Sequence, residues 1–336
     1  MTLFHYARAA ALALLCAETP FLPARAEAPQ QRVQAPGWQR TMLGDFEITA
    51  LSDGTHVFPV TTVMTGIDAA AIDGALARQG LALPVQGSIN AFLVNTGKQL
   101  VLIDSGAGAL YGPCCGRVLE NLRAAGYRPE QVDVVLLTHL HKDHVGGILA
   151  DGKRAFPNAV VRVAAPDARY WRDPAARAQA PAFLSSFFDA ARAALAPYDA
   201  VGRFQPFDAA AGAELAPGIR PLAEPGHTPG HSGYLVESRG QALLVWGDVV
   251  HVAALQLDHP QAAVTYDSSA ADAVGTRRAL LERVAADRLL VGAAHIAFPG
   301  LGRLRRDGAG FTWLPLNYEG DPAAPALTAA PQPSTR

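Results

Sequence analysis

The chain has 336 residues, of which 50% are hydrophobic and 17% are charged. This composition is typical of a globular enzyme and excludes a chain that is mainly disordered or mainly embedded in a membrane. The formal net charge is −2, so the chain has no excess of basic residues to neutralise phosphates. We therefore expect no nucleic-acid partner.

The first residues have the pattern of a secretory signal peptide. The start carries Arg8 and no acid, a short apolar run follows at Ala9–Ala17, and two small-x-small cleavage sites end at Ala26 and Ala28. The apolar run is too short to span a bilayer, which needs roughly 20 residues. We therefore expect residues 1–28 to be removed and the protein to be periplasmic or secreted. The alternative is an alanine-rich start with no targeting role.

The rest of the chain divides into a polar lead at 29–40, one globular domain at 41–320 and a tail at 321–336. The tail is rich in Pro and Ala, and we expect it to be disordered. Apolar β-branched runs and alternating segments within the domain predict strands at 46–51, 90–95, 100–103, 132–137, 160–164, 234–237, 242–246 and 289–291. Longer segments predict helices at 115–125, at 167–196 with breaks at Pro174 and Pro181, and at 270–286.

Turn residues complete this pattern. Ser52–Gly54 predicts a turn after the first strand, and Thr96–Lys98 predicts a hairpin between the second and third. Strands and helices are mixed in both halves of the domain. A layered α/β arrangement with two sheets and helices outside them follows.

Two cysteines remain after the signal peptide, and they are adjacent: Cys114 and Cys115. Adjacent cysteines rarely form a disulfide because the geometry is strained, and their spacing does not match a zinc-ligand pair. We expect small, buried residues at the start of a helix. The domain must then be stabilised by its hydrophobic core, which a chain of this size can form.

Four residues of metal-binding types lie within six positions, just after the strand predicted at 132–137. They are His139, His141, Asp143 and His144. Because side chains alternate along a strand, the first two histidines can point to the same side just past its end. Imidazole nitrogen and carboxylate oxygen together suit zinc, and also manganese, cobalt or iron. Burying these polar groups without a metal would be costly.

Three further candidates follow strands or occupy tight loops later in the chain. His227 lies in the segment GHTPGH, Asp248 follows the strand predicted at 242–246, and His295 follows the strand predicted at 289–291. We expect these three to join the first four at one site. His231, in the same segment as His227, is expected to support the site rather than to bind metal.

These seven positions resemble, in type and order, the metal site of the metallo-β-lactamase superfamily, and the resemblance covers nearly the whole mature chain. It implies a four-layer αββα sandwich with two divalent metal ions, zinc first and cobalt, manganese or iron as alternatives. One ion would be bound by His139, His141 and His227. The other would be bound by Asp143, His144 and His295. Asp248 would bridge the two ions together with a hydroxide.

Shorter segments narrow the resemblance to the methyl parathion hydrolase family and related lactonases. The similar segments are 44–55, 93–97, 124–133, 156–162, 298–300 and 317–318. The family implies an exported homodimer whose substrate pocket is lined by aromatic residues, here Tyr111, Trp171 and Phe188. Ordinary core packing is the alternative for Trp171 and Phe188. His251 and Tyr266 stand where the family has aliphatic side chains, which disfavours a phosphotriester as the main substrate.

The chemistry that this site implies is hydrolysis by a bridging hydroxide, with no serine or cysteine nucleophile. Two ions roughly 3.5–4 Å apart lower the pKa of a shared water and polarise the electrophile. Asp143 and Asp248 are the candidate catalytic residues. Because both are held as ligands, leaving groups that need no strong acid are favoured. We expect small neutral esters or lactones as substrates, with phosphotriesters hydrolysed more weakly.

Two alternatives stay open: a dedicated phosphotriesterase, and a periplasmic zinc-binding protein without activity. A protein that only binds zinc would not need a bridged pair of ions with an open position. Other relatives are disfavoured. The commonest zinc β-lactamases have a cysteine where Asp248 stands, glutathione-dependent relatives belong in the cytosol, and nucleases need a basic surface. The Gly-x-Ser-x-Gly pattern of α/β-hydrolases is absent from the sequence.

Overall fold

The computed structural model describes residues 28–320, in which a compact unit begins at Pro36. The predicted signal peptide up to Glu27 and the predicted disordered tail lie outside the described residues. Within the described residues, none of the helices combines the length and the apolar character that crossing a membrane requires.

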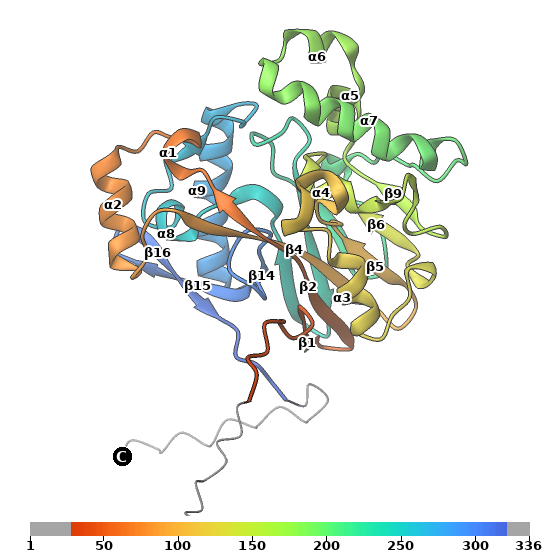
Figure 1. Ribbon diagram of the computed structural model, residues 1–336, viewed down its shortest axis with the longest axis horizontal. Helices are drawn as coiled ribbons and strands as arrows, with labels where there is room; N and C mark the ends of the chain where they lie inside the picture. The colour runs from red at the N-terminus through yellow and green to blue at the C-terminus, as the bar shows by residue number, and fades with distance from the viewer. Residues whose placement is uncertain (1–27, 321–336) are drawn as a thin grey trace, which may run out of the picture. The chain divides into compact units, whose positions relative to one another are not determined.

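Two six-stranded sheets form the centre of this unit (Figure 1). The order in the first sheet is β1 (Trp38–Leu43), β2 (Phe46–Phe58), β4 (Val85–Asn95), β5 (Leu100–Ile103), β6 (Val134–Leu136) and β9 (Val160–Arg162). The order in the second is β10 (Ile219–Ala223), β11 (Ser232–Ser238), β12 (Gln241–Val245), β14 (Leu290–Gly292), β15 (Leu301–Asp307) and β16 (Gly310–Pro315). Each sheet thus comes from one half of the chain, and β1 begins inside the segment predicted as a polar lead.

Alternation along the strands explains how the layers stack. In β5, Leu100 and Leu102 join one hydrophobic cluster, whereas Val101 and Ile103 join another. Successive side chains point to opposite faces of a sheet, so β5 is buried on both sides. The cluster that contains Val101 also contains Tyr234 and other residues of the second sheet. The two sheets therefore pack face to face.

Helices cover the outer faces of both sheets. The hydrophobic cluster on the outside of the first sheet includes residues of α3 (Val118–Ala124), α5 (Ala165–Arg172) and α7 (Ser185–Asp199). The cluster outside the second sheet includes residues of α9 (Ala270–Asp287). This is the four-layer αββα arrangement that the sequence predicts.

Local signals set the ends of several helices. α9 begins after Ser269, whose hydroxyl accepts a hydrogen bond from the Asp272 N–H at 3.3 Å, the usual role of an N-cap serine. The helical stretch predicted at 167–196 is broken as expected, because Pro174 starts a separate helix, α6 (Pro174–Gln179), and Pro181 precedes α7. Both interruptions are therefore confirmed.

The turn predicted at Ser52–Gly54 is wrong. β2 continues through it, and the register with β4 shifts between Ser52 and Gly54, which marks a β-bulge. Asp53 is buried in the bulge, and its carboxylate accepts from the Ala107 N–H at 2.9 Å. A Cβ at position 54 would overlap the carbonyl oxygen of Cys114. Glycine is present there to allow two backbones to approach, not to reverse the chain.

The helix predicted at 115–125 is shorter than expected. α3 begins at Val118, and both cysteines lie in the turn before it. Cys114 and Cys115 are half-buried free thiols rather than buried residues of a helix start. The Cys114 thiol donates to the Tyr111 carbonyl at 3.3 Å, so it contributes to the shape of this turn.

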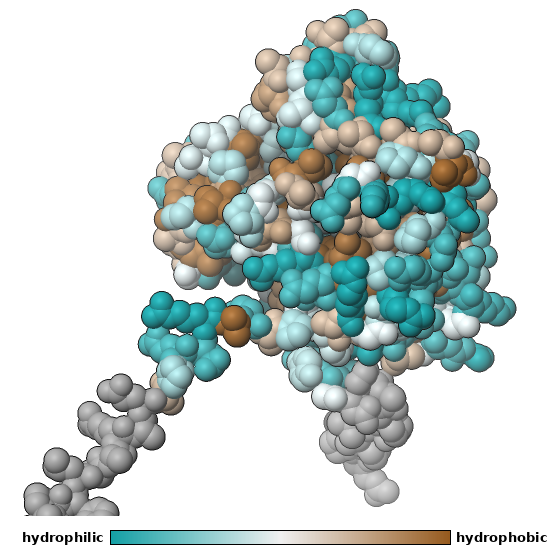
Figure 2. Space-filling view, turned by 45° about the vertical axis from the view of Figure 1, so that its right-hand side comes forward, coloured by the Kyte–Doolittle hydropathy of each residue, from teal (hydrophilic) through white to brown (hydrophobic). Residues whose placement is uncertain are grey.

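Two shorter helices and α8 form a separate hydrophobic cluster beside the sheets. α1 (Val60–Val63) and α2 (Ala69–Arg78) connect β2 with β4, and they pack against residues near α8 (Ala253–Gln256). On the face that Figure 2 displays, hydrophilic and hydrophobic residues are interspersed. Single exposed apolar side chains of this kind are usual for a folded domain.

Candidate metal centre

The segment with the first four candidate ligands leaves the first sheet after β6 and contains the short helix α4 (Lys142–Val145). Thr138 anchors its start, because its N–H and its hydroxyl both donate to the Asp104 carboxylate, at 2.8 and 2.9 Å. The segment ends at Gly147, close to the turn after β5. A Cβ at Gly147 would overlap the carbonyl oxygen of Ser105 in that turn. The four candidate ligands of this segment are all buried.

The other three candidate ligands come from the second sheet. His227 follows β10, Asp248 lies in a 3₁₀ turn at Gly247–Val249 after β12, and His295 follows β14. β12 and β14 are parallel neighbours, so the residues after their ends meet at the same edge of the sheet. All three side chains are buried, with 3%, 3% and 7% of their surface exposed.

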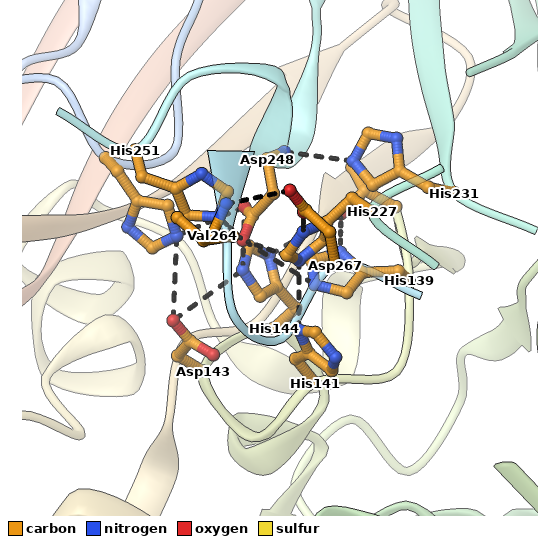
Figure 3. A network of polar contacts seen from close by, with 12 residues as sticks. His139, His141, Asp143, His144, His227, His231, Asp248, His251, Val264 and Asp267 are labelled. Carbon is orange, nitrogen blue, oxygen red and sulfur yellow. Dashed lines mark hydrogen bonds and ion pairs between the residues drawn. The ribbon is translucent and has the colours of Figure 1, made fainter. Parts of the chain in front are cut away.

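The potential ligand atoms gather in two groups (Figure 3). One group contains His139, His141, His227 and Asp248, and the other contains Asp143, His144 and His295. Within each group the ligand atoms lie within 4.8 Å of one another. The structure thus brings together all seven candidates in the two sets that the sequence resemblance implies, and they fit a dinuclear metal site.

Asp248 faces both groups. Its Oδ1 atom lies 3.0 Å from His144 Nε2 and 3.1 Å from His295 Nε2, both in the second group. Its Oδ2 atom lies 3.3 Å from His227 Nε2 in the first group. The two carboxylate oxygens therefore point toward different sets of ligands.

Buried atoms without partners test whether these residues fit metal ions. Among the described residues, the Nε2 atoms of His139, His141 and His144 are buried and have no hydrogen-bond partner. A buried polar atom without a partner costs roughly 1–3 kcal/mol. Coordination to a cation would remove this cost at each atom. The mixed nitrogen and oxygen donors suit zinc and other divalent ions.

In three of the candidate ligands, the ring nitrogen Nδ1 makes a hydrogen bond that fixes the imidazole. Each donates from Nδ1 to a fixed oxygen: His144 to Asp104 at 2.9 Å, His227 to Asp267 at 2.7 Å, and His295 to the Ser88 carbonyl at 2.8 Å. Protonation at Nδ1 leaves Nε2 free to bind a metal and fixes the plane of the ring. These contacts therefore prepare the rings as ligands.

Sequence analysis missed these three supports. Asp104 had a usable signal, because it directly follows the buried strand at Leu100–Ile103, as Asp248 follows the strand predicted at 242–246. Ser88 gave no signal, since it acts through its backbone carbonyl. Asp267 follows β13 (Ala263–Val264), a two-residue strand too short to be predicted from the sequence pattern, and only the folded chain places it beside His227.

Burial favours neutral rings at His139 and His141 beside an ionised Asp248, whereas at His144, His227 and His295 the neighbouring carboxylates, that of Asp248 first, together outweigh burial and raise the pKa. Burial alone would raise the pKa of Asp248, but the imidazoles of His144, His295 and His139 hold it well below its usual range. Burial, together with neighbouring imidazoles, keeps the pKa values of His139 and His141 well below the ordinary value. Both rings are therefore neutral near pH 7, the form that binds a metal.

Two of the residues expected to line the substrate pocket lie directly beside the ligands. His251 is buried, and its Nε2 lies 3.1 Å from Asp248 Oδ2. The Tyr266 ring lies 5.5 Å from the His251 ring and 5.8 Å from the His227 ring, measured between centroids. Burial raises the pKa of the Tyr111 hydroxyl, and the negative charge of Asp143, a member of the second group, raises it further.

The aromatic residues of α5 and α7 are arranged differently from expectation. Trp171 is buried and sets its edge against His141, with centroids 5.0 Å apart. Phe188 points into the core, fully buried against Trp171 at 4.6 Å. Phe187, which sequence analysis did not name, packs against His141 at 5.1 Å. Adjacent residues of a helix point about 100° apart, so Phe187 faces His141 while Phe188 packs in the core, the alternative that the sequence left open for Phe188.

Comparison with a family model decides which family this is. Residues 84–295 match the model described as the metallo-beta-lactamase superfamily, and this range contains all seven candidate ligands. The chain belongs to the metallo-β-lactamase superfamily. The two sheets with helices on their outer faces agree with that membership.

Solved structures of this superfamily share the fold over nearly the whole domain. The hydrolase AbOPH, of the beta lactamase superfamily, is 37% identical, and the match covers 85% of this chain and 100% of AbOPH with a TM-score of 0.81. The dizinc quorum-quenching lactonase AidC, solved with a bound product, is 24% identical. That match covers 84% of this chain and 98% of AidC with a TM-score of 0.78, and it shows the fold alone.

Two curated relatives match this chain over shorter spans. Thioesterase pkgB of Emericella nidulans is 39% identical over 87 residues, which are 26% of this chain and 23% of the thioesterase. The N-acyl homoserine lactonase of Bacillus cereus is 25% identical over 130 residues, 38% of this chain and 42% of the lactonase. The matches thus span less than half of each curated relative. Together, the comparisons support hydrolase activity in this superfamily member.

Proposed function

We propose that this metallo-β-lactamase superfamily member hydrolyses small neutral esters or lactones with two divalent metal ions, zinc first. The position of Asp248 carries this proposal, because its two oxygens face different ligand groups, at 3.0 Å from His144 and 3.3 Å from His227. When bound, two such ions would supply an activated water and a Lewis acid for the oxygen of the electrophile.

The chain's own residues would orient the reaction. Asp143 and Asp248 are proposed as catalytic residues because they would hold the ions. Burial raises the pKa of Tyr111, and the charge of Asp143 raises it further, so this phenol remains protonated and is able to donate a hydrogen bond. Tyr266, beside His227 and His251, offers a second hydroxyl close to the site.

A pocket next to the site favours a neutral substrate. Its volume is about 460 Å³, and His251 and His295 form part of its wall, whereas Tyr111, Trp171 and Tyr266 do not line it. Most of its other lining residues are apolar, and none of the described residues that line it is Lys or Arg. An anionic substrate would find no cationic side chain to pair with there. The lactonases among the structural and sequence relatives support a lactone as one substrate class.

A phosphotriester with an aryl leaving group is the second candidate substrate. Phe187, which is only partly buried, sets its aromatic ring against His141, at 5.1 Å between centroids. Flat aromatic surface beside a ligand would pack well against an aryl group. This contact does not discriminate aryl phosphotriesters from aryl esters, so the substrate class has to be measured.

A substrate screen tests the proposed function. Purified protein loaded with zinc, cobalt or manganese would be assayed against lactones, acyl-homoserine lactones, aryl acetates and dialkyl aryl phosphates. We expect the highest kcat/KM with a lactone or an aryl ester. Faster hydrolysis of methyl paraoxon than of every lactone and ester would favour the phosphotriesterase. Protein with two bound ions and no turnover of any of these substrates would contradict the proposal.

Replacing His251 with leucine should raise phosphotriester turnover relative to lactone turnover, by about tenfold. Burial lowers the pKa of His251 to about 4 even though Asp248 opposes this shift, so the ring is neutral at pH 7. Its Nδ1 is buried and has no hydrogen-bond partner among the described residues, so a phosphotriester arm packed against this side of the ring would keep the polar atom unsatisfied. A buried polar atom without a hydrogen bond costs roughly 1–3 kcal/mol. A difference of about 1.4 kcal/mol in the activation barrier corresponds to about a tenfold change in rate.

The measurement is the ratio of kcat/KM for methyl paraoxon to that for a δ-lactone. His259→Leu is the matched control, since it makes the same change in the loop after α8, outside both ligand groups. An unchanged ratio in His251→Leu, with metal content preserved, would contradict the role given to His251.

We also propose that the mature chain begins near Glu27 or Pro29 and is exported to the periplasm. The basic start, the apolar run at Ala9–Ala17 and the cleavage sites motivate this proposal. N-terminal sequencing of the protein from a periplasmic extract should read from one of these positions. Recovery of the chain with Met1 intact in the cytosolic fraction would refute it.

A further inference from the structure

Two buried residues lie beside the backbone of Asp248, and neither belongs to a candidate ligand group. The backbone N–H of Asp248 donates to His231 Nε2 at 2.9 Å (Figure 3). The other ring nitrogen of His231, Nδ1, lies 3.1 Å from the backbone carbonyl oxygen of Glu224. His231 and Glu224 are 1% and 3% exposed, so water does not compete for these contacts.

The partners fix how the His231 ring is protonated. A backbone N–H only donates, so Nε2 has to accept and carries no proton. A backbone carbonyl only accepts, so Nδ1 has to donate and carries the proton. Both ring nitrogens are therefore satisfied in one orientation and one tautomer, which places a rigid acceptor behind the Asp248 amide.

The turn that carries Asp248 packs directly against the His231 ring. The φ and ψ angles of Asp248 are −99° and 31°, outside the helical region although it lies within a 3₁₀ turn. The preceding residue, Gly247, has a φ of 53°, and a Cβ there would press on His231. The Gly247–Asp248 peptide thus lies directly against the imidazole.

The Glu224 side chain takes no part in this contact. Burial raises its pKa well above the usual value, so the carboxyl is neutral. Neither oxygen has a hydrogen-bond partner among the described residues, and Oε2 is 3.8 Å from His231 Nδ1. It is therefore the backbone of Glu224, not its carboxyl group, that holds the ring.

We propose that His231 is a positioning residue, which holds the Asp248 backbone so that the two carboxylate oxygens face the two ligand groups. It neither binds an ion nor touches the substrate. The proposal rests on the proposed function only in requiring that metal ions occupy the site. Residues that orient metal ligands in this way typically change metal affinity by 10- to 100-fold when replaced.

A matched pair of amide substitutions tests the proposal. The side-chain amide of glutamine reaches the position of Nε2, so His231→Gln keeps an acceptor for the Asp248 N–H. Asparagine reaches only the position of Nδ1, so His231→Asn keeps a group near Glu224 and loses the acceptor. Zinc affinity would be measured by competition with a chromophoric chelator, and the visible spectrum would be recorded with cobalt.

We expect His231→Asn to lose about 10- to 100-fold in affinity for at least one zinc ion and to show an altered cobalt spectrum. His231→Gln should remain within about threefold of the parent, well inside that range. Glu224→Gln, which keeps the backbone and the neutral shape of the side chain, should behave as the parent. Parental zinc affinity and an unchanged cobalt spectrum in His231→Asn would overturn the proposal.

A measurement on the unmodified protein covers the case in which His231→Asn does not fold. The ¹⁵N chemical shifts of the His231 ring report which nitrogen carries the proton. We expect protonated Nδ1 and unprotonated Nε2, and a proton on Nε2 would overturn the proposal. None of these readouts depends on turnover. If the protein binds two zinc ions but hydrolyses no ester or lactone, the proposed function fails and the role of His231 stands.

Discussion

Replacing Asp248 with alanine should lower kcat/KM for lactones and aryl esters by about 1000-fold or more, which corresponds to roughly 4 kcal/mol in the activation barrier. Asp248 is the one candidate ligand whose two oxygens lie close to both ligand groups, at 3.1 Å from His295 Nε2 and 3.3 Å from His227 Nε2. Without it, several buried imidazoles would surround an empty space. At least one ion should then bind more weakly.

The measurements are metal content after extensive dialysis and turnover at saturating zinc. Asp189→Ala is the matched control, because Asp189 is an exposed aspartate whose partner is Arg177 on the surface. It should keep two ions and parental activity. An Asp248→Ala variant that also keeps two ions and full turnover would rule out the bridging role.

Removing the metal ions with a chelator should lower the melting temperature by roughly 5–10 °C and abolish turnover. An ion present at 100 times its Kd stabilises the folded chain by about 2.7 kcal/mol, and 1 kcal/mol shifts Tm by roughly 2–4 °C in a domain near this size. In the metal-free protein, buried nitrogens such as His139 Nε2 and His141 Nε2 would have no partner. Adding zinc back should restore both stability and activity.

Differential scanning calorimetry, with metal analysis of each sample, would measure this effect. Chelator already saturated with zinc is the control, and it should change neither Tm nor turnover. If the ions are removed completely and the Tm and the activity both stay at their parental values, the seven residues do not form the metal centre described here.

Much of the fold and the ligand set could be predicted because both depend on strong local patterns. The strand at Val134–Leu136 is buried on both faces, so it reads as an unbroken apolar run, and the histidines after it stand out. β15 escaped prediction because it is an arginine-rich strand in which only Leu301, Gly302 and Leu304 are buried. A pattern with so many charges resembles a loop.

Other features depend on contacts between distant parts of the chain. The bulge at Ser52–Gly54 has the composition of a turn, and only the approach of the Cys114 backbone shows why glycine is needed there. The choice between Phe187 and Phe188 depends on the rotation of α7 about its axis. Sequence similarity places this helix along the chain but does not fix which of two neighbouring aromatic residues faces His141.

The distribution of the ligands between the two sheets has a mechanical consequence. The first group combines His139 and His141, which follow β6, with His227 from the second sheet. The second group combines Asp143 and His144, which also follow β6, with His295 from the second sheet. A bound ion would therefore be a cross-link between the two halves of the chain. The cysteines of the described part of the chain, Cys114 and Cys115, are free thiols. Metal ions would thus constrain the unfolding of this domain as disulfides do in many proteins, by closing long loops.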